Sequence, residues 1–120
     1  MKGIEIIERV DNLEYNQYDT EQKLRWLHQL DGQIYREVIE RHEGASPMPP
    51  SYITGQEELL VGEPYGEPMY TSYILAQIAL YNGEMSRYNT HGMSYNNQYM
   101  AWSADYNRTH MPTGARQFIF

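Results

Sequence analysis

The amino-acid sequence predicts an all-α protein: a bundle of about four helices with a long interhelical loop rich in proline and glycine and an extended C-terminal tail. Two observations lead to this fold class. Apolar and aromatic residues recur at helical spacing in both halves of the chain. A helix cannot run through the segment at 45–68, which holds five of the six prolines. We expect one helical domain at 1–112, with its loop at 45–67, and a tail at 113–120.

A short amphipathic helix is expected at the N-terminus, over about residues 2–12. Its apolar positions follow the spacing of one helix face, and they are Ile4, Ile7 and Val10. A helix of this length is marginal in isolation, so it needs tertiary contacts.

A longer helix is expected to begin at Asp19 and to run to about Arg41. Asp19 followed by Gln22 has the form of a capping box, in which a short side chain at the helix start accepts a backbone hydrogen bond. Gly44 should end the helix, because glycine readily adopts the left-handed backbone of a C-terminal cap. The positions that continue the apolar face are Leu24, Leu27, Leu30 or Asp31, Ile34 and Val38.

The loop at 45–67 contains two short apolar pieces, at 52–53 and 59–61, separated by a turn signal at Thr54 and Gly55. They predict extended segments or a small hairpin. A loop of this length is often a contact arm, in which case Tyr52 and Ile53 would belong to an interface. The alternative is that the loop simply packs over the helices.

The second half of the chain carries an aromatic ladder, because Tyr81, Tyr88, Tyr95 and Trp102 recur every seven residues. This spacing places them on one helical stripe. Gly83 and the residues at 89–92 are poor helix formers, and two helices are predicted, at about 67–88 and 92–109, although the unbroken spacing also permits one kinked helix. Pro112 should end the last helix.

Tyrosine is typical of partly wet protein interfaces, because its ring buries apolar area while its hydroxyl keeps a hydrogen bond. The ladder either lies in the core of the bundle or is exposed in part and covered on assembly. We select Tyr88, Tyr95, Tyr99 and Trp102 as core or intersubunit aromatics. The chain ends in apolar residues that are expected to dock on a neighbour, namely Gln117, Phe118, Ile119 and Phe120.

The composition and the absence of known motifs argue against most kinds of catalytic and ligand-binding site. The chain has no cysteine, so disulfides and thiolate sites are excluded, and its net charge of -7 disfavours tight nucleic-acid binding. No Glu-x-x-His or His-x-x-x-His pair supports a metal site, and the histidines are expected on the surface or as caps. Nucleophile-elbow and phosphate-loop patterns are also missing. We expect no catalytic residue, no metal and no cofactor.

Without a signal peptide or an apolar span, the protein should be soluble and intracellular when made.

Many short segments resemble a family of small structural proteins of tailed bacteriophages, the head-tail connector or neck adaptor subunits. The similarity covers about residues 5–112. The segments that carry it are 21–27, 30–35, 42–44, 59–61, 63–65, 76–78, 81–84, 87–89 and 106–112.

This resemblance implies a mostly helical structural protein of the virion, located at the head-tail junction and, during assembly, in the host cytoplasm. About twelve copies would form a ring that links the portal protein to a downstream neck or tail protein. Double-stranded DNA would pass nearby without specific binding, and no membrane is involved. The loop at 45–66 and the tail residues Gln117 to Phe120 would contact the portal or the next subunit of the ring.

Two other classes of function compete with this interpretation. One is a different phage-encoded protein-binding module, such as a neck or tail completion protein, a packaging accessory protein or a host-factor binder. The other is a small hydrolase whose site the sequence does not reveal.

Overall fold

The computed structural model describes residues 1–42 and 44–110, and within them it confirms an all-α bundle. Helix α1 spans Gly3–Leu13, α2 spans Thr20–Glu37, α3 spans Gly66–Tyr81 and α4 spans Met85–Thr109. A short 3-10 turn, η1, covers Ile39–Arg41. The expected tail at 113–120 lies outside the described residues.

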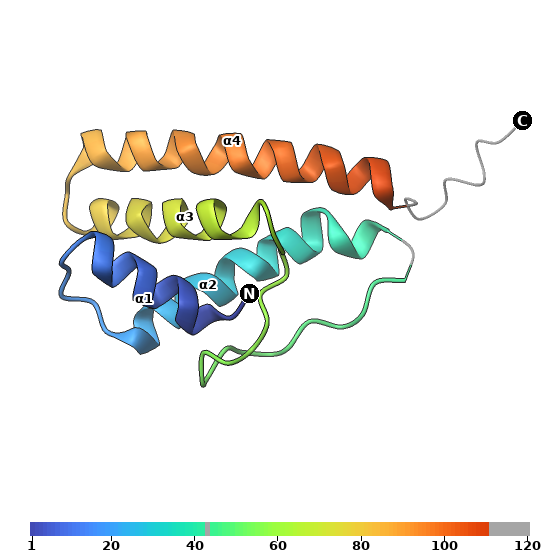
Figure 1. The fold of residues 1–120 in the computed structure, drawn as a ribbon, viewed down its shortest axis with the longest axis horizontal. Coiled ribbons are helices and arrows are strands. Elements are labelled where there is room, and N and C mark those ends of the chain that lie inside the picture. Colours follow the sequence, from blue (N-terminus) through green and yellow to red (C-terminus); the bar gives the residue numbers. More distant parts are fainter. Residues whose placement is uncertain (43, 111–120) are drawn as a thin grey trace, which may run out of the picture.

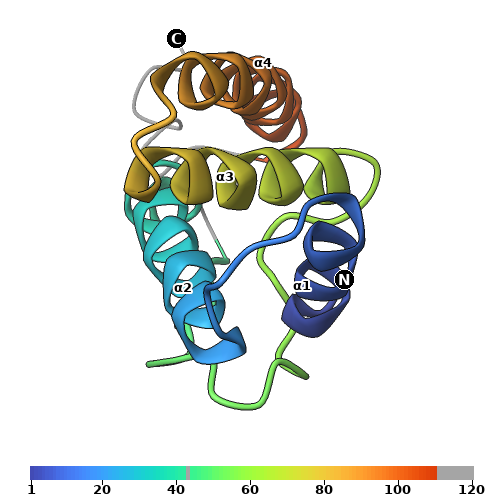
Figure 2. The same ribbon diagram turned by 90° about the vertical axis from the view of Figure 1, so that its left-hand side faces the viewer.

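The helices are arranged in three layers, with α3 in the middle (Figures 1 and 2). Helices α1 and α2 cover one side of α3, and α4 covers the other. Ten of the sixteen residues of α3 are buried, as expected for a helix that is covered on two opposite sides. By contrast, α4 has 25 residues and only Trp102 is buried. Among residues 1–42 and 44–110, helix α4 is therefore an outer layer with one side uncovered.

The N-terminal half follows the predicted spacing closely. Asp19 is the N-cap of α2, and its Oδ1 accepts a 2.8 Å hydrogen bond from the backbone N–H of Gln22. Every apolar position predicted for α2 is buried, and so is Asp31. In α1 the most deeply buried positions include Ile6, while Ile4 is only partly buried.

The end of α2 was predicted too late. The helix stops at Glu37 rather than near Arg41, and the chain continues through η1. Gly44 does have the left-handed φ of 79°, but it lies beyond η1 and not at the end of α2. The β-branched pair Val38 and Ile39, which are poor helix formers, coincides with the change of helix type.

The break between the last two helices was also predicted in the wrong place. The turn lies at 82–84, whereas 89–92 is helical. Gly83 has a φ of 76°, its N–H donates to the Leu80 carbonyl (3.1 Å), and the N–H of Glu84 donates to the Ala79 carbonyl (2.8 Å). These two bonds form a Schellman motif, which satisfies the last carbonyls of α3. The aromatic ladder is thus divided, since Tyr81 lies on α3 and the other members on α4.

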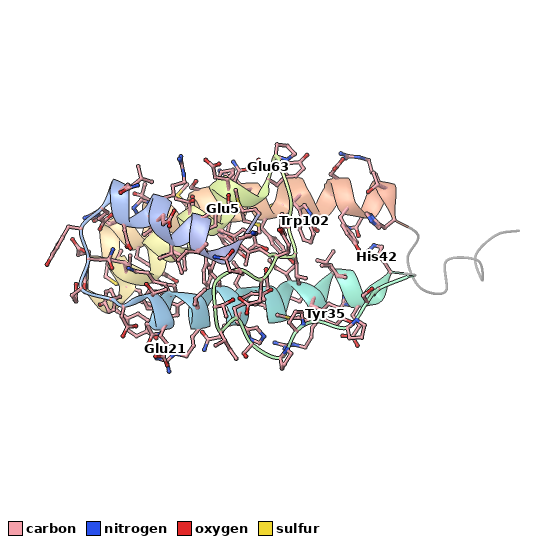
Figure 3. All side chains as sticks on the ribbon, turned by 60° about the horizontal axis from the view of Figure 1, so that its bottom comes forward. Glu5, Glu21, Tyr35, His42, Glu63 and Trp102 are labelled. Atoms are coloured by element: carbon pink, nitrogen blue, oxygen red, sulfur yellow. The ribbon has the colours of Figure 1, made fainter. Side chains whose placement is uncertain are left out.

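The loop between η1 and α3 packs over the helices, and no hairpin forms in its described residues. Gly55 makes the predicted turn with a φ of 81°, and its carbonyl accepts a 2.9 Å bond from the N–H of Ile4 at the start of α1. The N–H of Leu59 donates to the Met1 carbonyl (2.9 Å). Figure 3 shows this loop lying across the side formed by α1 and α2. Within the single chain, the loop therefore packs over the helices, which was the alternative to a contact arm.

Candidate interaction surface

The uncovered side of α4 is the candidate functional surface. Three methionines stand out on it: Met85 is 52% exposed, Met93 67% and Met100 68%. Their separations of eight and seven residues place them along one stripe of the helix. Flexible, exposed methionines are well suited to contact with a partner because the thioether side chain adapts its shape.

Charge is distributed very unevenly between α4 and the rest of the chain. From Tyr88 to Ala104 the sequence contains no Asp, Glu, Lys or Arg, while residues 1–84 hold 15 of the 16 carboxylates. Residues 1–65, which form α1, α2 and the loop that lies across them, hold 13 carboxylates against six lysines and arginines. Figure 3 shows Glu21 on the outer edge of this acidic side. A second copy of this chain, itself negatively charged, meets the least electrostatic repulsion along α4.

An aromatic row follows the seam where α4 meets the layers beneath it. Successive ring centroids are 5.4 Å apart for Tyr73 and Tyr95, 6.0 Å for Tyr95 and Tyr99, and 6.2 Å for Tyr99 and Trp102. The Tyr99 hydroxyl donates a 3.1 Å hydrogen bond to Glu37 at the end of α2. Burial raises the pKa of Tyr73, Tyr95 and Tyr99, so these hydroxyls keep their protons at neutral pH.

A cavity of about 190 Å³ opens between α3 and α4 beside this row. Its walls are uncharged and combine aromatic rings with side-chain amides. The lining residues are Tyr73, Ala76, Gln77, Tyr88, Gly92, Tyr95 and Asn96. A space of this size holds about six waters, which is less than the 300–1,000 Å³ of a typical small-molecule pocket. It suits one small side chain of a partner.

The residues predicted for the interface lie in different environments. Trp102 is buried in the core at 7% exposure, and Tyr52 is buried at 5%, so these two side chains stabilise the single chain. Tyr88, Tyr95 and Tyr99 are half-buried. Ile53 is 78% exposed and lies on the loop side of the molecule. The tail residues, Gln117, Phe118, Ile119 and Phe120, lie outside the described residues.

Sequence reasoning missed two features of the structure. The methionine stripe has the same helical spacing as the tyrosines, but its exposure depends on which side of α4 meets α3. The second feature is Asp31, a carboxyl buried at 0% exposure in α2. The sequence left its position open between the core and the surface.

Asp31 anchors the loop to the helices. Its carboxyl accepts hydrogen bonds from the hydroxyls of Tyr52 (2.6 Å) and Tyr70 (2.5 Å) and from the backbone N–H of Leu60 (3.1 Å). Burial raises the pKa of Asp31, and these hydrogen bonds oppose that rise. Since the group is sealed from solvent, it positions the loop and has no access to a substrate.

The histidines were expected on the surface or as caps, and His42 is a cap. Its Nδ1 lies 2.5 Å from the Val38 carbonyl at the end of α2, and the side chain is buried at 5% exposure. Its ring lies nearly perpendicular to that of Tyr106, with an interplanar angle of 88° and centroids 4.8 Å apart. Its Nε2 has no hydrogen-bond partner within the described residues.

Within 1–42 and 44–110, no three His, Asp or Glu side chains gather in a group that could hold a metal ion. No described helix combines the length and hydropathy that crossing a lipid bilayer requires. The fold and the surface define an all-α bundle with one neutral, methionine-bearing helix side left uncovered. No protein-family model, curated protein or solved structure matches this chain.

Proposed function

We propose that this protein is a structural virion protein, a head-tail connector or neck adaptor subunit of a tailed bacteriophage. In this role copies pack side by side into a ring that links the portal to the tail and surrounds the DNA passage. The proposal rests on the resemblance of segments across residues 5–112 and on the surface of α4.

The observation that carries the proposal is the separation of charge. A subunit of such a ring needs a neutral surface toward its neighbours, because like-charged surfaces repel at short range. It also benefits from an acidic surface toward the DNA, which repels the phosphates and prevents sticking. The α4 side has the first property, and the side formed by α1, α2 and the loop, with 13 carboxylates and six lysines and arginines in residues 1–65, has the second. Packing of one patch onto a different patch closes into a ring when the rotation between copies permits it.

The alternative of another phage-encoded binding module shares the neutral surface of α4. It differs in the partner, which would be a single protein of the host or of the packaging machinery. The acidic side formed by α1, α2 and the loop has no specific role in that case, so the separation of charge favours the connector.

The test is to add the purified protein to DNA-filled, tailless heads of the phage that encodes it and to image the portal vertex by electron cryomicroscopy. We expect a ring of this protein under the portal, with α4 between neighbouring copies. A ring in which α4 faces the DNA would contradict the charge argument. Bare vertices at saturating protein would overturn the connector assignment and favour a different partner.

A further inference from the structure

We propose that Asn82 is a site of covalent modification, where attack by the backbone nitrogen of Gly83 converts the side-chain amide to a carboxylate. The rate is set by how often the end of the bundle at which α3 turns into α4 opens. Asn82 is the only one of the seven asparagines that is followed by glycine. This inference does not depend on the proposed function.

The reaction needs only water and hydroxide ion. Hydroxide takes the proton from the nitrogen of Gly83, which forms a bond with Cγ of Asn82. The bond between Cγ and Nδ2 breaks, and the departing nitrogen takes a proton from water and leaves as ammonia. Water then opens the five-membered succinimide ring at either carbonyl carbon, which gives aspartate or isoaspartate at position 82. Glycine favours the first step because it has no Cβ to hinder the attack.

The folded backbone at Asn82 is far from the geometry that ring closure requires. The ring contains Cβ, Cα and the carbonyl carbon of Asn82 together with the nitrogen of Gly83, so these four atoms must lie nearly in one plane. Because the substituents of a tetrahedral carbon are about 120° apart in projection, this plane needs a ψ of about −120°, outside the main allowed regions. The observed ψ of Asn82 is −6°. The chain must therefore leave its present conformation before the reaction can occur.

Backbone hydrogen bonds oppose this change of conformation. The N–H of Gly83, the attacking group, donates to the Leu80 carbonyl (3.1 Å), and the N–H of Glu84 donates to the Ala79 carbonyl (2.8 Å). Rotation of ψ at Asn82 would carry both N–H groups away from their acceptors. Since ring closure is slow compared with local opening, its rate follows the equilibrium population of the open state.

The side chain of Asn82 is held as well, and it joins two connections of the bundle. Its Oδ1 accepts hydrogen bonds from the Tyr18 hydroxyl (2.8 Å) and from Nε2 of Gln17 (3.1 Å), both in the connection between α1 and α2. Its Nδ2 donates to Oε1 of Glu84 (3.4 Å). These contacts form a latch that keeps the end of the bundle closed and so slows the modification of Asn82.

The modification would in turn weaken the latch. A carboxylate at position 82 lies in the last turn of α3, where the helix dipole disfavours negative charge. It also faces Glu84, which already shares the cation of Arg87 with Glu14. Isoaspartate adds one carbon atom to the backbone inside the turn, which displaces the two hydrogen bonds that end α3. Either product therefore loosens the start of α4.

The experiment follows the modification by mass spectrometry in the full-length protein, kept folded in buffer or unfolded in guanidinium chloride at the same mildly alkaline pH. Trypsin releases residues 42–87 as one peptide, in which Asn82 is the only asparagine. We expect the folded protein to react at least about tenfold more slowly than the unfolded chain, because only the open fraction reacts. Equal rates in the two states, or no reaction of the unfolded chain, would overturn the inference.

Variants of the donors test the latch. Tyr18→Phe should speed the reaction of the folded protein about fivefold, because one typical hydrogen bond changes the open fraction by that factor, and should leave the unfolded rate unchanged. Gln17→Ala removes the other donor from an exposed position, so it repeats the test without disturbing a packed ring. Tyr15→Phe is the matched control, since the side chain of Tyr15 is 94% exposed. A folded rate that neither donor variant changes would exclude control by the latch.

The attacking atom and the effect of the product are tested separately. Gly83→Ala should slow the reaction of the unfolded chain at least about tenfold, because the methyl group hinders the attack, and an unchanged rate would exclude this nitrogen. Asn82→Asp should speed hydrogen exchange at the amides of Gly83 and Glu84 roughly two- to fivefold, through the unfavourable charge at the helix end. Asn107→Asp, which adds the same charge at an exposed position in the last turn of α4, should leave this exchange unchanged. Wild-type exchange in Asn82→Asp would show that the modification does not loosen the bundle end.

Discussion

The hydroxyl of Tyr70 on α3 donates a 2.5 Å hydrogen bond to the carboxyl of Asp31 on α2, 39 positions earlier in the chain. The same hydroxyl accepts a 2.9 Å bond from the backbone N–H of Val61 in the loop. One buried side chain therefore ties two helices and the loop together. This arrangement explains how a long segment without regular structure stays in a fixed place.

Tyr70→Phe should lower the free energy of unfolding by about 1–3 kcal/mol, because it leaves the N–H of Val61 and one oxygen of Asp31 without their partner in a buried site. Equilibrium urea denaturation measures the change. Tyr15→Phe is the matched control, since Tyr15 is 94% exposed and loss of its hydroxyl should change stability by less than about 0.5 kcal/mol. Equal effects of the two variants would contradict the buried network.

Asp31 should give stability a defined pH dependence. Its pKa is raised above the ordinary 3.8 by burial, so the folded state holds the proton more tightly than the unfolded state does. Its contribution to the free energy of unfolding therefore falls as pH rises from about 4 through the raised folded pKa. Asparagine does not ionise, so the unfolding free energy of the wild type minus that of Asp31→Asn should decrease over this window. Urea denaturation at several pH values tests this, and a constant difference would show that Asp31 titrates normally.

Two glycines in the second half should respond in opposite directions. Gly83→Ala should destabilise the protein by about 1 kcal/mol or more, because the φ of 76° at the turn disfavours a side chain. Gly92→Ala should stabilise it by about 0.5–1 kcal/mol, since this glycine lies inside α4 with free space around it. Thermal or urea unfolding of both variants checks the position of the helix break. If both substitutions destabilised the protein, the result would indicate a strained turn at 89–92 as well.

The role of the α4 surface in subunit contacts can be tested by introducing a charge at an exposed position of α4, where the fold tolerates it. Met93→Asp should change stability little, because Met93 is 67% exposed, but it should strongly reduce the occupancy of the ring on tailless heads. The control is Gln29→Glu, which adds the same charge at an exposed position of α2. Circular dichroism verifies folding, and electron cryomicroscopy counts decorated vertices. Equal occupancy for both variants would remove α4 from the subunit interface.

The tail prediction can be examined by deleting residues 117–120. The described core lies within residues 1–110, so the shortened protein should keep its helical content and its unfolding midpoint. We expect it to lose incorporation into particles, because the apolar terminal residues are the predicted anchor. Incorporation at the wild-type level would exclude the tail as the docking element.

The sequence by itself predicted the fold class, the start of α2, the buried side of α2 and the position of the loop. These features depend on local chemistry. Asp19 caps whichever helix follows it, helical spacing fixes which positions share one side, and prolines exclude a helix from most of the loop. The predicted loop at 45–67 ends two residues too late, because α3 begins at Gly66 and has Pro68 in its first turn, where proline is tolerated. The sequence misplaced the break before α4, because residues 83 and 92 are both glycines and local preference does not choose between them. It also misplaced the end of α2, because Gly44, the expected cap, lies beyond η1.

Tertiary structure decided which surfaces are buried and which are free. Tyr81, Tyr88, Tyr95 and Trp102 share one sequence period, yet the turn at Gly83 divides them between two helices, and only Trp102 reaches the core. Asp31 is buried because loop and helix donors converge on it from distant positions. Spacing along a chain determines which residues of a helix lie together. Only the packing of other helices determines whether water or protein covers them, because burial depends on contacts between segments far apart in sequence.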